Sequence, residues 1–313
     1  MIDHQWAEKA YTNLIKVRKT EEAIADEYKN QEMRCPVHLS IGQEAVSVGA
    51  SMCLQNEDII FSNHRCHSHY LAKGGNLDAM IAELYGKRTG CVKGLGGSMH
   101  LMDDTVGMLG ASSIVGGSIP LAVGAGLTFK MRNKPHAAVT YFGDGAAEEG
   151  VFHESMNFAA LKKLPVIFIC ENNYTATSSP LSSRKPLDNI YRHGEAFAIP
   201  GTVVDGNDVV AVYEATCEAM KRIGNGKGPS LIEAKTFRML KHVGPEKDLS
   251  SGVRTEEEWN RWLAKCPVKK FTEHCLEQDL LSTEAMEKIQ KKIEMEIERA
   301  FELAKSAPVA KWT

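Results

Sequence analysis

Two short polar segments in the middle of the chain carry side chains that could hold a metal ion beside a phosphate group. A G-D-G-A sequence spans residues 143–146 and an E-N-N sequence spans residues 171–173, and each lies at the end of an apolar run. Mg²⁺ takes about six oxygen ligands and usually shares them between protein and phosphate. Asp144 offers a carboxylate, Asn173 an amide oxygen and Thr175 a backbone carbonyl. These residues form a candidate Mg²⁺ site that phosphate oxygens and water would complete.

The residues that follow Asp144 suit an anionic group. Gly145 and Ala146 would let the backbone approach a diphosphate closely, and the N-terminus of a following helix favours its negative charge. A G-D-G sequence alone is more often a β-turn, because turns use the same residue types. The combination with a helix, a second apolar run and an Asn pair is far more specific, and Asn173 follows Asp144 by 29 residues.

Alternating apolar runs and helical stretches between about residues 40 and 240 predict the scaffold that positions these segments. Near-continuous apolar strands separated by helices are typical of an α/β fold, a parallel sheet with helices on both faces. Open α/β sheets bind ligands at the carboxyl ends of their strands, so both polar segments should meet there. The predicted strands are 58–62, 137–143, 165–170, 201–205 and 230–237, the helices 43–53, 76–86, 116–131, 148–163 and 207–223, and the loops 90–115, 174–190 and 239–254.

Both ends of the chain are predicted to be helical. Residues 3–30 have recurring apolar positions that indicate a surface or interface helix, and residues 283–305 carry an apolar stripe at helical spacing. We therefore divide the chain into an N-terminal helical extension (1–35), an α/β domain (36–250) and a C-terminal helical appendage (251–313) without chemistry of its own.

The composition argues against several classes of protein. The 313 residues are 43% hydrophobic and 25% charged with a net charge of −3, which favours neither nucleic-acid nor membrane binding. The N-terminal sequence has no apolar secretory core, and no apolar stretch approaches the ~18 residues of a membrane span. We expect a cytoplasmic location. The eight cysteines contain no C-x-x-C pair and are expected to be reduced thiols.

The motifs resemble those of a known family. Residues from about 5 to 305 are similar to the α subunit of the first component of thiamine-diphosphate-dependent 2-oxo acid dehydrogenases, a group that includes pyruvate, branched-chain 2-oxo acid and acetoin dehydrogenases. The spacing of 29 residues between Asp144 and Asn173 matches the thiamine diphosphate fingerprint of the group. The H-R-x-H-x-H and GLGGSMH sequences most resemble the acetoin branch, because pyruvate enzymes usually have Tyr at the position of His64. The matching segments are HLSIGQEAVSVG (38–49), HRCHSHYLAKG (64–74), GGSMH (96–100), GASSIVGGSIPLAVGAG (110–126), GDG…ENN (143–173) and KTFRMLKH (235–242).

The resemblance supports the Mg²⁺ and diphosphate sites and implies further contacts with thiamine diphosphate. Arg65 and Arg238 match arginines that pair with phosphate oxygens, a geometry that suits guanidinium groups. The backbone of Ser113 and Val115 matches the segment that hydrogen-bonds the aminopyrimidine ring. His64, next to Arg65, is assigned to the same cofactor site.

The resemblance also implies two catalytic histidines. His242 matches the histidine near the thiazolium ring and also contacts the cofactor, and His67 aligns with a second histidine at the mouth of the site. The H-R-C-H-S-H run at 64–69 could instead suggest a zinc cluster. We consider that unfavourable, because the ligands would point to opposite faces of a strand and Arg65 would repel a cation.

The expected chemistry is cleavage of a carbon–carbon bond next to a carbonyl. Thiamine diphosphate stores the resulting carbanion, and the glutamate that activates it comes in the family from a β subunit, in an assembly of two α and two β chains. His242, with an ordinary pKa of about 6.5, would stabilise or protonate an oxyanion. The acyl group would pass to the lipoyl arm of an acyltransferase. The substrate, acetoin or a small 2-oxo acid such as pyruvate, stays open.

Two departures from the family pattern keep other interpretations open. Tyr174 and Thr175 stand where the family usually has x-Tyr, and the usual G-H-S becomes Lys241-His242-Val243, which alters the loop near the substrate. A β-partnered carboligase in a sugar or secondary pathway, which transfers the acyl carbanion to another carbonyl, is therefore the second interpretation. A non-catalytic scaffold subunit is the third, and the retained site residues argue against it.

Overall fold

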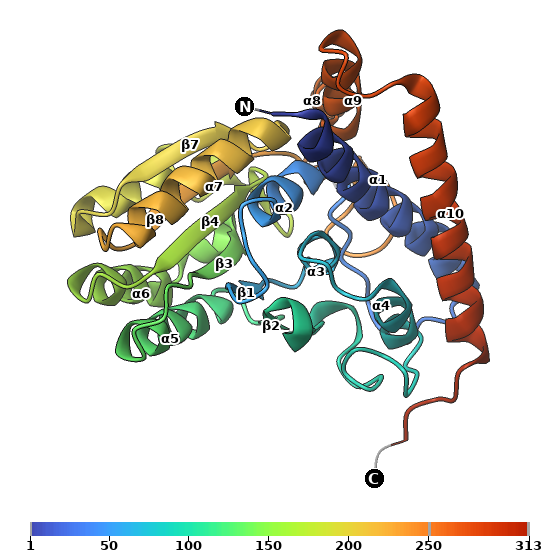
Figure 1. The fold of residues 1–313 in the computed structure, drawn as a ribbon, viewed down its shortest axis with the longest axis horizontal. Helices are drawn as coiled ribbons and strands as arrows, with labels where there is room; N and C mark the ends of the chain where they lie inside the picture. The colour runs from blue at the N-terminus through green and yellow to red at the C-terminus, as the bar shows by residue number, and fades with distance from the viewer. Residues whose placement is uncertain (1, 250–251, 312–313) are drawn as a thin grey trace.

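A parallel sheet forms the centre of the structure, a computed structural model that describes residues 2–249 and 252–311 (Figure 1). Its strands lie in the order β2-β1-β3-β4-β8-β7, and every neighbouring pair is parallel. The α/β prediction is confirmed. The strands of this sheet are β1 (Ile59–Ser62), β2 (Met108–Ala111), β3 (Ala138–Gly143), β4 (Val166–Asn172), β7 (Gly201–Asp205) and β8 (Ser230–Lys235), and a separate hairpin pairs β5 (Thr175–Ala176) with β6 (Ser179–Pro180).

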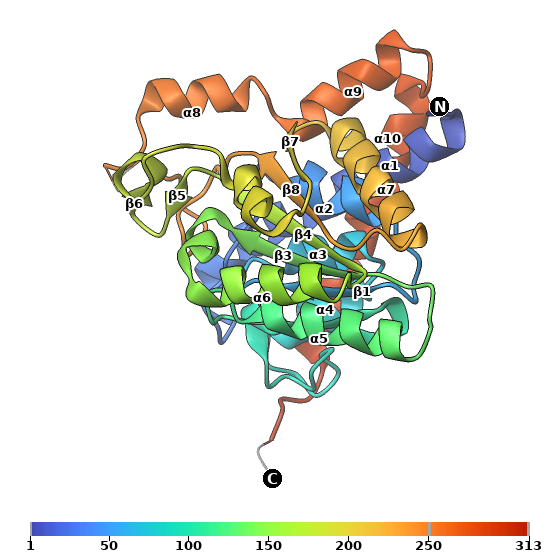
Figure 2. The same ribbon diagram turned by 90° about the vertical axis from the view of Figure 1, so that its left-hand side faces the viewer.

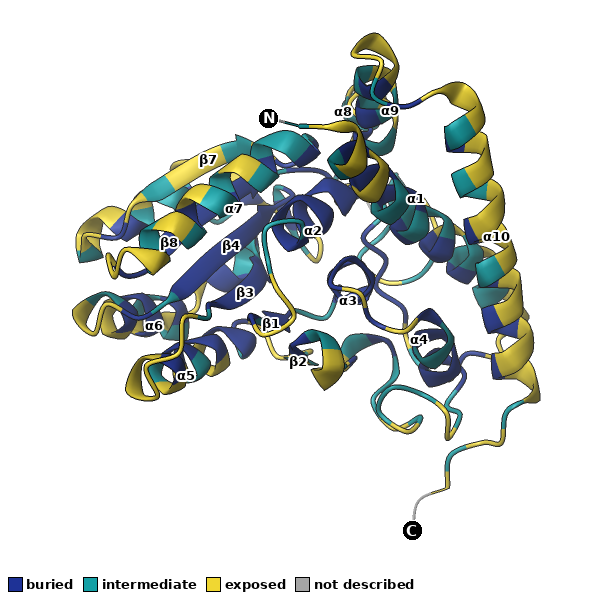
Figure 3. Cartoon of the chain, in the orientation of Figure 1, coloured by how far each residue is buried: buried dark blue, intermediate teal, exposed yellow. Residues whose placement is uncertain are grey.

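Helices cover both faces of the sheet, as the strand pattern predicts. The helices are α1 (His4–Glu27), α2 (Glu44–Ser51), α3 (His67–Ala72), α4 (Leu77–Leu84), α5 (Ser118–Met131), α6 (Gly150–Leu161), α7 (Val209–Gly224), α8 (Glu256–Leu263), α9 (Pro267–Glu277) and α10 (Thr283–Ser306). Phe142 and Phe168 pack in one buried cluster with α5 and α6. Tyr141 and Ile169 point to the other face and pack with α1, α2 and α7. Strands β3 and β4 are therefore almost entirely buried (Figure 3).

Strand register brings the two polar segments together. Gly143, the last residue of β3, pairs with Glu171 of β4, so the G-D-G-A and E-N-N sequences leave the sheet side by side. Asp144 begins a short 3₁₀ helix that runs to Glu148, and α6 starts only at Gly150. The carboxyl edge of these strands is thus the predicted site, although a 3₁₀ turn separates Asp144 from the helix N-terminus.

The terminal helices pack into the body of the molecule. Helix α1 is confirmed, and its apolar face packs into the core, where Leu14, Val17 and Ile24 are fully buried. Helix α10 runs alongside α1 and α4 and buries Met286 and Ile293, so its apolar stripe has the predicted role (Figures 1 and 2). The predicted boundary between residues 250 and 251 lies outside the described residues, and the division into three segments remains a prediction.

Two local predictions are wrong. The predicted loop 90–115 contains β2, a four-residue edge strand that is too short to show a periodic pattern. Residues 67–72 form helix α3 and not a strand, so the argument that their side chains alternate between two faces does not apply. Asp208 caps α7 by accepting hydrogen bonds from the N–H groups of Val210 and Ala211.

The prediction of eight reduced thiols is also wrong. Cys53, just after α2, and Cys217, in α7, form a disulfide, with Cα atoms 5.6 Å apart and a sequence separation of 164 residues. The two helices pack closely: a Cβ atom on Gly49 would lie 2.6 Å from the carbonyl oxygen of Val209. The packing of α2 against α7 brings the two cysteines together. Their spacing along the chain therefore could not reveal the pair.

None of the helices in the described ranges combines the length and the apolar character that a membrane span requires.

Candidate functional site

A small cavity of about 100 Å³ opens at the carboxyl edge of β3 and β4. It brings together most of the side chains predicted to bind a cofactor, although they come from five separate parts of the chain. The lining residues are Gln43, Asn63, His64, Arg65, Val115, Gly143, Asp144, Gly145, Glu171, Asn173, Thr175, Ala176, Thr177 and His242.

The carboxylate of Asp144 is buried and already faces a cation. Its side chain is in contact with the guanidinium of Arg184, which also pairs with Glu148. Burial raises the pKa of Asp144, and the pairing with Arg184 lowers it only in part. The buried carboxylate is thus placed to bind a positive group, which fits a role as a metal ligand.

Asn173 and Thr175 lie next to Asp144 and are held by hydrogen bonds. The Asn173 side-chain Nδ2 donates to Gln43 Oε1 at 3.0 Å, and its Oδ1 accepts from the Thr175 N–H at 3.2 Å. The Asn173 carbonyl accepts from Arg254 Nη2 at 2.9 Å. The amide oxygen keeps a second lone pair, so the pair of residues fits the oxygen ligands that Mg²⁺ prefers.

The turn after β3 leaves room only for small residues. A Cβ atom on Gly145 would lie 2.8 Å from Cβ of Ala176 in the β5–β6 hairpin. The side chain of Ala146 is buried in the cluster beneath α5 and α6. Close packing against the hairpin therefore explains Gly145, in addition to the predicted approach of a diphosphate.

Three buried arginines concentrate positive charge beside the cavity. Arg65 donates to the carbonyls of Leu39 and His242, at 2.6 and 3.1 Å. Arg238 pairs with Asp248 at 2.7 Å, while its Nε and Nη1 have no hydrogen-bond partner among the described residues. Burial and the neighbouring guanidinium of Arg238 lower the pKa of Arg65 to about 9 and that of Arg254 to about 10. Mutually repelling cations with free N–H groups fit a polyanion such as a diphosphate.

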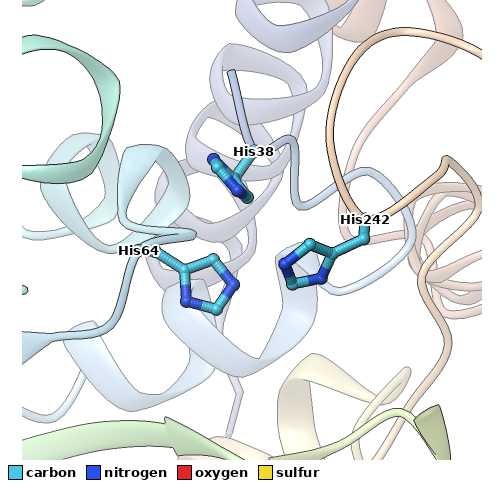
Figure 4. A group of neighbouring side chains, drawn as sticks. All are labelled: His38, His64 and His242. Carbon is cyan, nitrogen blue, oxygen red and sulfur yellow. The ribbon is translucent and has the colours of Figure 1, made fainter. Parts of the chain in front are cut away.

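Three imidazole rings converge at the same cavity (Figure 4). His64 and His242 were predicted to lie there, and His38 joins them, with ring centroids 4.9 to 5.2 Å apart. Burial lowers the pKa of all three rings, and the charges of Arg65 and of neighbouring rings or arginines lower it further. The pKa is about 3 for His38, about 2 for His64 and about 4 for His242. All three rings are therefore neutral at physiological pH.

Residues 12–313 match the dehydrogenase E1 component family. The chain belongs to this family. The α subunit of acetoin:2,6-dichlorophenolindophenol oxidoreductase from Bacillus subtilis is 38% identical over 301 residues, covering 96% of this chain and 89% of that protein. The corresponding subunit from Cupriavidus necator is 38% identical over 298 residues, covering 95% and 89%. The pyruvate dehydrogenase E1 component subunit alpha of Porphyra purpurea is 36% identical over 305 residues, covering 95% and 88%.

Four predicted residues of this E1 component chain do not line the cavity, namely His67, Ser113, Ala146 and Arg238. His67 is fully buried and not at the mouth of the site: its Nε2 is 2.8 Å from Ser98 Oγ and its Nδ1 is 3.4 Å from Glu21. The ring points inward because α3 carries it toward α1. Ser113 is exposed and does not line the cavity, whereas its neighbour Val115 does.

Sequence reasoning missed several charged or polar residues at this cavity, among them His38, Arg254 and Arg184. His38 could have been found, because it opens the segment 38–49 that carries the family resemblance. Arg254 is the last residue of the predicted loop 239–254, which has no periodic pattern that could indicate where its side chain points. Arg184 lies in the predicted loop 174–190 and reaches Asp144 only because the β5–β6 hairpin folds over the strand ends.

Proposed function

We propose that the chain is the α subunit of a thiamine-diphosphate- and Mg²⁺-dependent dehydrogenase that acts on acetoin or a small 2-oxo acid such as pyruvate. The observation that carries the proposal is the meeting of Asp144, Asn173 and Arg65 at one cavity on the sheet edge. The named relatives, which include acetoin and pyruvate enzymes, support the same activity.

The residues of the cavity suit the two ends of the cofactor differently. Asp144, Asn173 and the Thr175 carbonyl would hold Mg²⁺, and the turn at Gly145 and Ala146 would lie against the diphosphate. Arg65 and Arg238 would pair with its oxygens. The backbone at Ser113 and Val115 would contact the aminopyrimidine ring.

Thiamine diphosphate supplies, when bound, the carbanion chemistry that breaks a carbon–carbon bond next to a carbonyl. The imidazoles of His242 and His64 are neutral and each can donate one N–H hydrogen bond to a carbonyl oxygen of the substrate. Arg65 and Arg238 help to keep the pKa of His242 low. Neutralising those arginines with a diphosphate would raise this pKa toward the ordinary range, so that a ring nitrogen of His242 could hold and deliver a proton.

A partner chain is part of the proposal. The cavity is far smaller than the roughly 300–1,000 Å³ of most ligand pockets, so the cofactor would extend beyond this chain. Ile114, Val115 and Leu121 expose apolar side chains next to the cavity, which is typical of a protein interface. We propose that a β subunit covers this face and supplies the activating glutamate, in an assembly of two α and two β chains, and that a lipoyl acyltransferase accepts the acyl group.

Calorimetry on the assembled α and β chains tests the cofactor site. Thiamine diphosphate with Mg²⁺ should bind to the unmodified assembly and lose most of its affinity after Asp144→Ala or Asn173→Ala. Equal affinity in the variants would overturn the site. Thermal stabilisation by cofactor plus Mg²⁺ is expected from a binding subunit, whereas no shift at saturation would favour a scaffold.

The acceptor decides between the two enzymatic interpretations. Reduction of ferricyanide or acyl transfer to lipoamide would support the dehydrogenase. Coupling of pyruvate to an aldehyde or ketone without either acceptor would support the carboligase.

A further inference from the structure

His38, His64 and His242 form a cluster, the three-histidine cluster, in which His38 has no role in the proposed cofactor site. The three side chains come from three distant segments, and their ring nitrogens lie within 4.8 Å of one another (Figure 4). His38 is buried, and its Nδ1 has no hydrogen-bond partner among the described residues. His64 and His242 line the cavity. A buried, unpaired nitrogen next to two accessible ones is an arrangement that a ligand could satisfy.

We propose that the three-histidine cluster binds a first-row transition ion such as Zn²⁺, with a fourth coordination position open to the cavity. Neutral imidazole suits Zn²⁺, Co²⁺, Ni²⁺ and Cu²⁺, whereas Mg²⁺ prefers oxygen. Three protein ligands with one open position are typical of accessible zinc sites. The cluster is thus chemically distinct from the oxygen ligands of Asp144 and Asn173, and its binding of an ion does not depend on the proposed cofactor.

Tetrahedral coordination would require the three imidazole rings to rotate but not to shift their centroids. Zn–N bonds of about 2.0–2.1 Å in a tetrahedral site place two ligand nitrogens about 3.3 Å apart and two ring centroids about 5.2 Å apart. The observed centroid separations are 4.9, 5.2 and 5.2 Å. The centroids are therefore already at the required spacing, and rotation of the rings about their Cβ–Cγ bonds would bring the nitrogens to the ion.

Nearby arginines oppose a cation, and neighbouring acidic groups offset part of their charge. Arg65 bonds two backbone carbonyls, and the carboxylates of Glu21 and Glu171 lie close enough to raise its pKa against the effect of burial. Arg238 is paired with Asp248, which also lies near Arg254. Three acidic groups, Glu21, Glu171 and Asp248, thus lie among the three arginines and offset part of their charge.

An ion at this position would inhibit the enzyme. It would occupy the imidazole nitrogens that otherwise face the substrate carbonyl, and it would stand beside the diphosphate arginines. Micromolar transition metal should therefore compete with the substrate rather than replace Mg²⁺.

Cobalt titration of the full chain, freed of metal by chelator, tests the proposal. One Co²⁺ should bind with the strong visible absorption of a four-coordinate ion, and Zn²⁺ but not millimolar Mg²⁺ should displace it. His64→Tyr keeps an aromatic ring but removes a ligand. It should weaken Co²⁺ binding at least as much as the roughly 10–100-fold loss that follows mutation of a residue that hydrogen-bonds a metal ligand. His38→Ala and His242→Ala should do the same, with thermal unfolding recorded to confirm that each variant is folded.

Two control variants separate this site from others. His100→Ala removes an exposed histidine elsewhere and should leave Co²⁺ binding unchanged. Asp144→Ala removes the proposed Mg²⁺ ligand and should also leave it unchanged, whatever its effect on cofactor. The proposal fails if His64→Tyr binds Co²⁺ as tightly as the unmodified chain, or if the bound ion has the weak absorption of an octahedral site that is lost in Asp144→Ala.

Discussion

Arg184 should act as a removable counter-ion at the proposed Mg²⁺ site, so Arg184→Ala should tighten metal binding. The guanidinium pairs with the buried carboxylate of Asp144 and with Glu148. Mg²⁺ can use this carboxylate fully only after the pairing with Arg184 is broken. A hydrogen bond to a charged group contributes about 1.5–3 kcal/mol, and each 1.4 kcal/mol is tenfold in affinity. We therefore expect roughly 10- to 100-fold tighter binding of Mg²⁺ with thiamine diphosphate.

The gain should depend on pH. Burial raises the pKa of Asp144 and Arg184 lowers it, so the variant should have a still higher pKa at this carboxyl. Protons then compete with the metal as pH falls through that pKa. The gain should be complete at pH 8 and should shrink at more acidic pH, while the metal-free variant should unfold more easily because a buried charge has lost its partner.

Isothermal titration calorimetry of the assembled α and β chains at pH 8 and pH 6 measures the effect. Arg192→Ala is the matched control, because Arg192 pairs with the exposed Glu195 at 3.0 Å and with no other acidic group among the described residues. It should change neither affinity nor its pH dependence. Weaker binding in Arg184→Ala would refute the reasoning, since it would mean that Arg184 holds the diphosphate itself.

Three further changes have expected outcomes. His67→Ala should lower the free energy of unfolding by about 2 kcal/mol or more, because it removes a buried, hydrogen-bonded ring, yet leave cofactor affinity per folded chain unchanged in calorimetry. Gly145→Ala should weaken cofactor binding measurably, because the new Cβ meets Ala176 at 2.8 Å, and a full-affinity variant would show that the hairpin yields. Cys53→Ser should lower the free energy of unfolding, measured with denaturant under oxidising conditions, by about 2–4 kcal/mol. With reductant present, the variant and the unmodified chain should be equally stable, because Cys217 is a free thiol in both.

The chain sequence alone determined the sheet, most of its strands and the meeting of Asp144 and Asn173 at one edge. Buried parallel strands are apolar throughout, so β3 and β4 are visible as runs. Because such strands end at one edge, Asp144 and Asn173 had to approach each other even though 29 residues separate them. The apolar composition of the strands and their parallel direction are sufficient to predict that the residues after them meet.

Only the tertiary structure decided which other side chains share that edge. His38, Arg184 and Arg254 reach the cavity from irregular segments whose course no periodicity records. The Cys53–Cys217 pair and the inward position of His67 likewise depend on how helices pack against one another. The sequence pattern of a helix or strand predicts which of its faces is buried. Which other helix or strand packs against that face depends on the packing of the whole molecule.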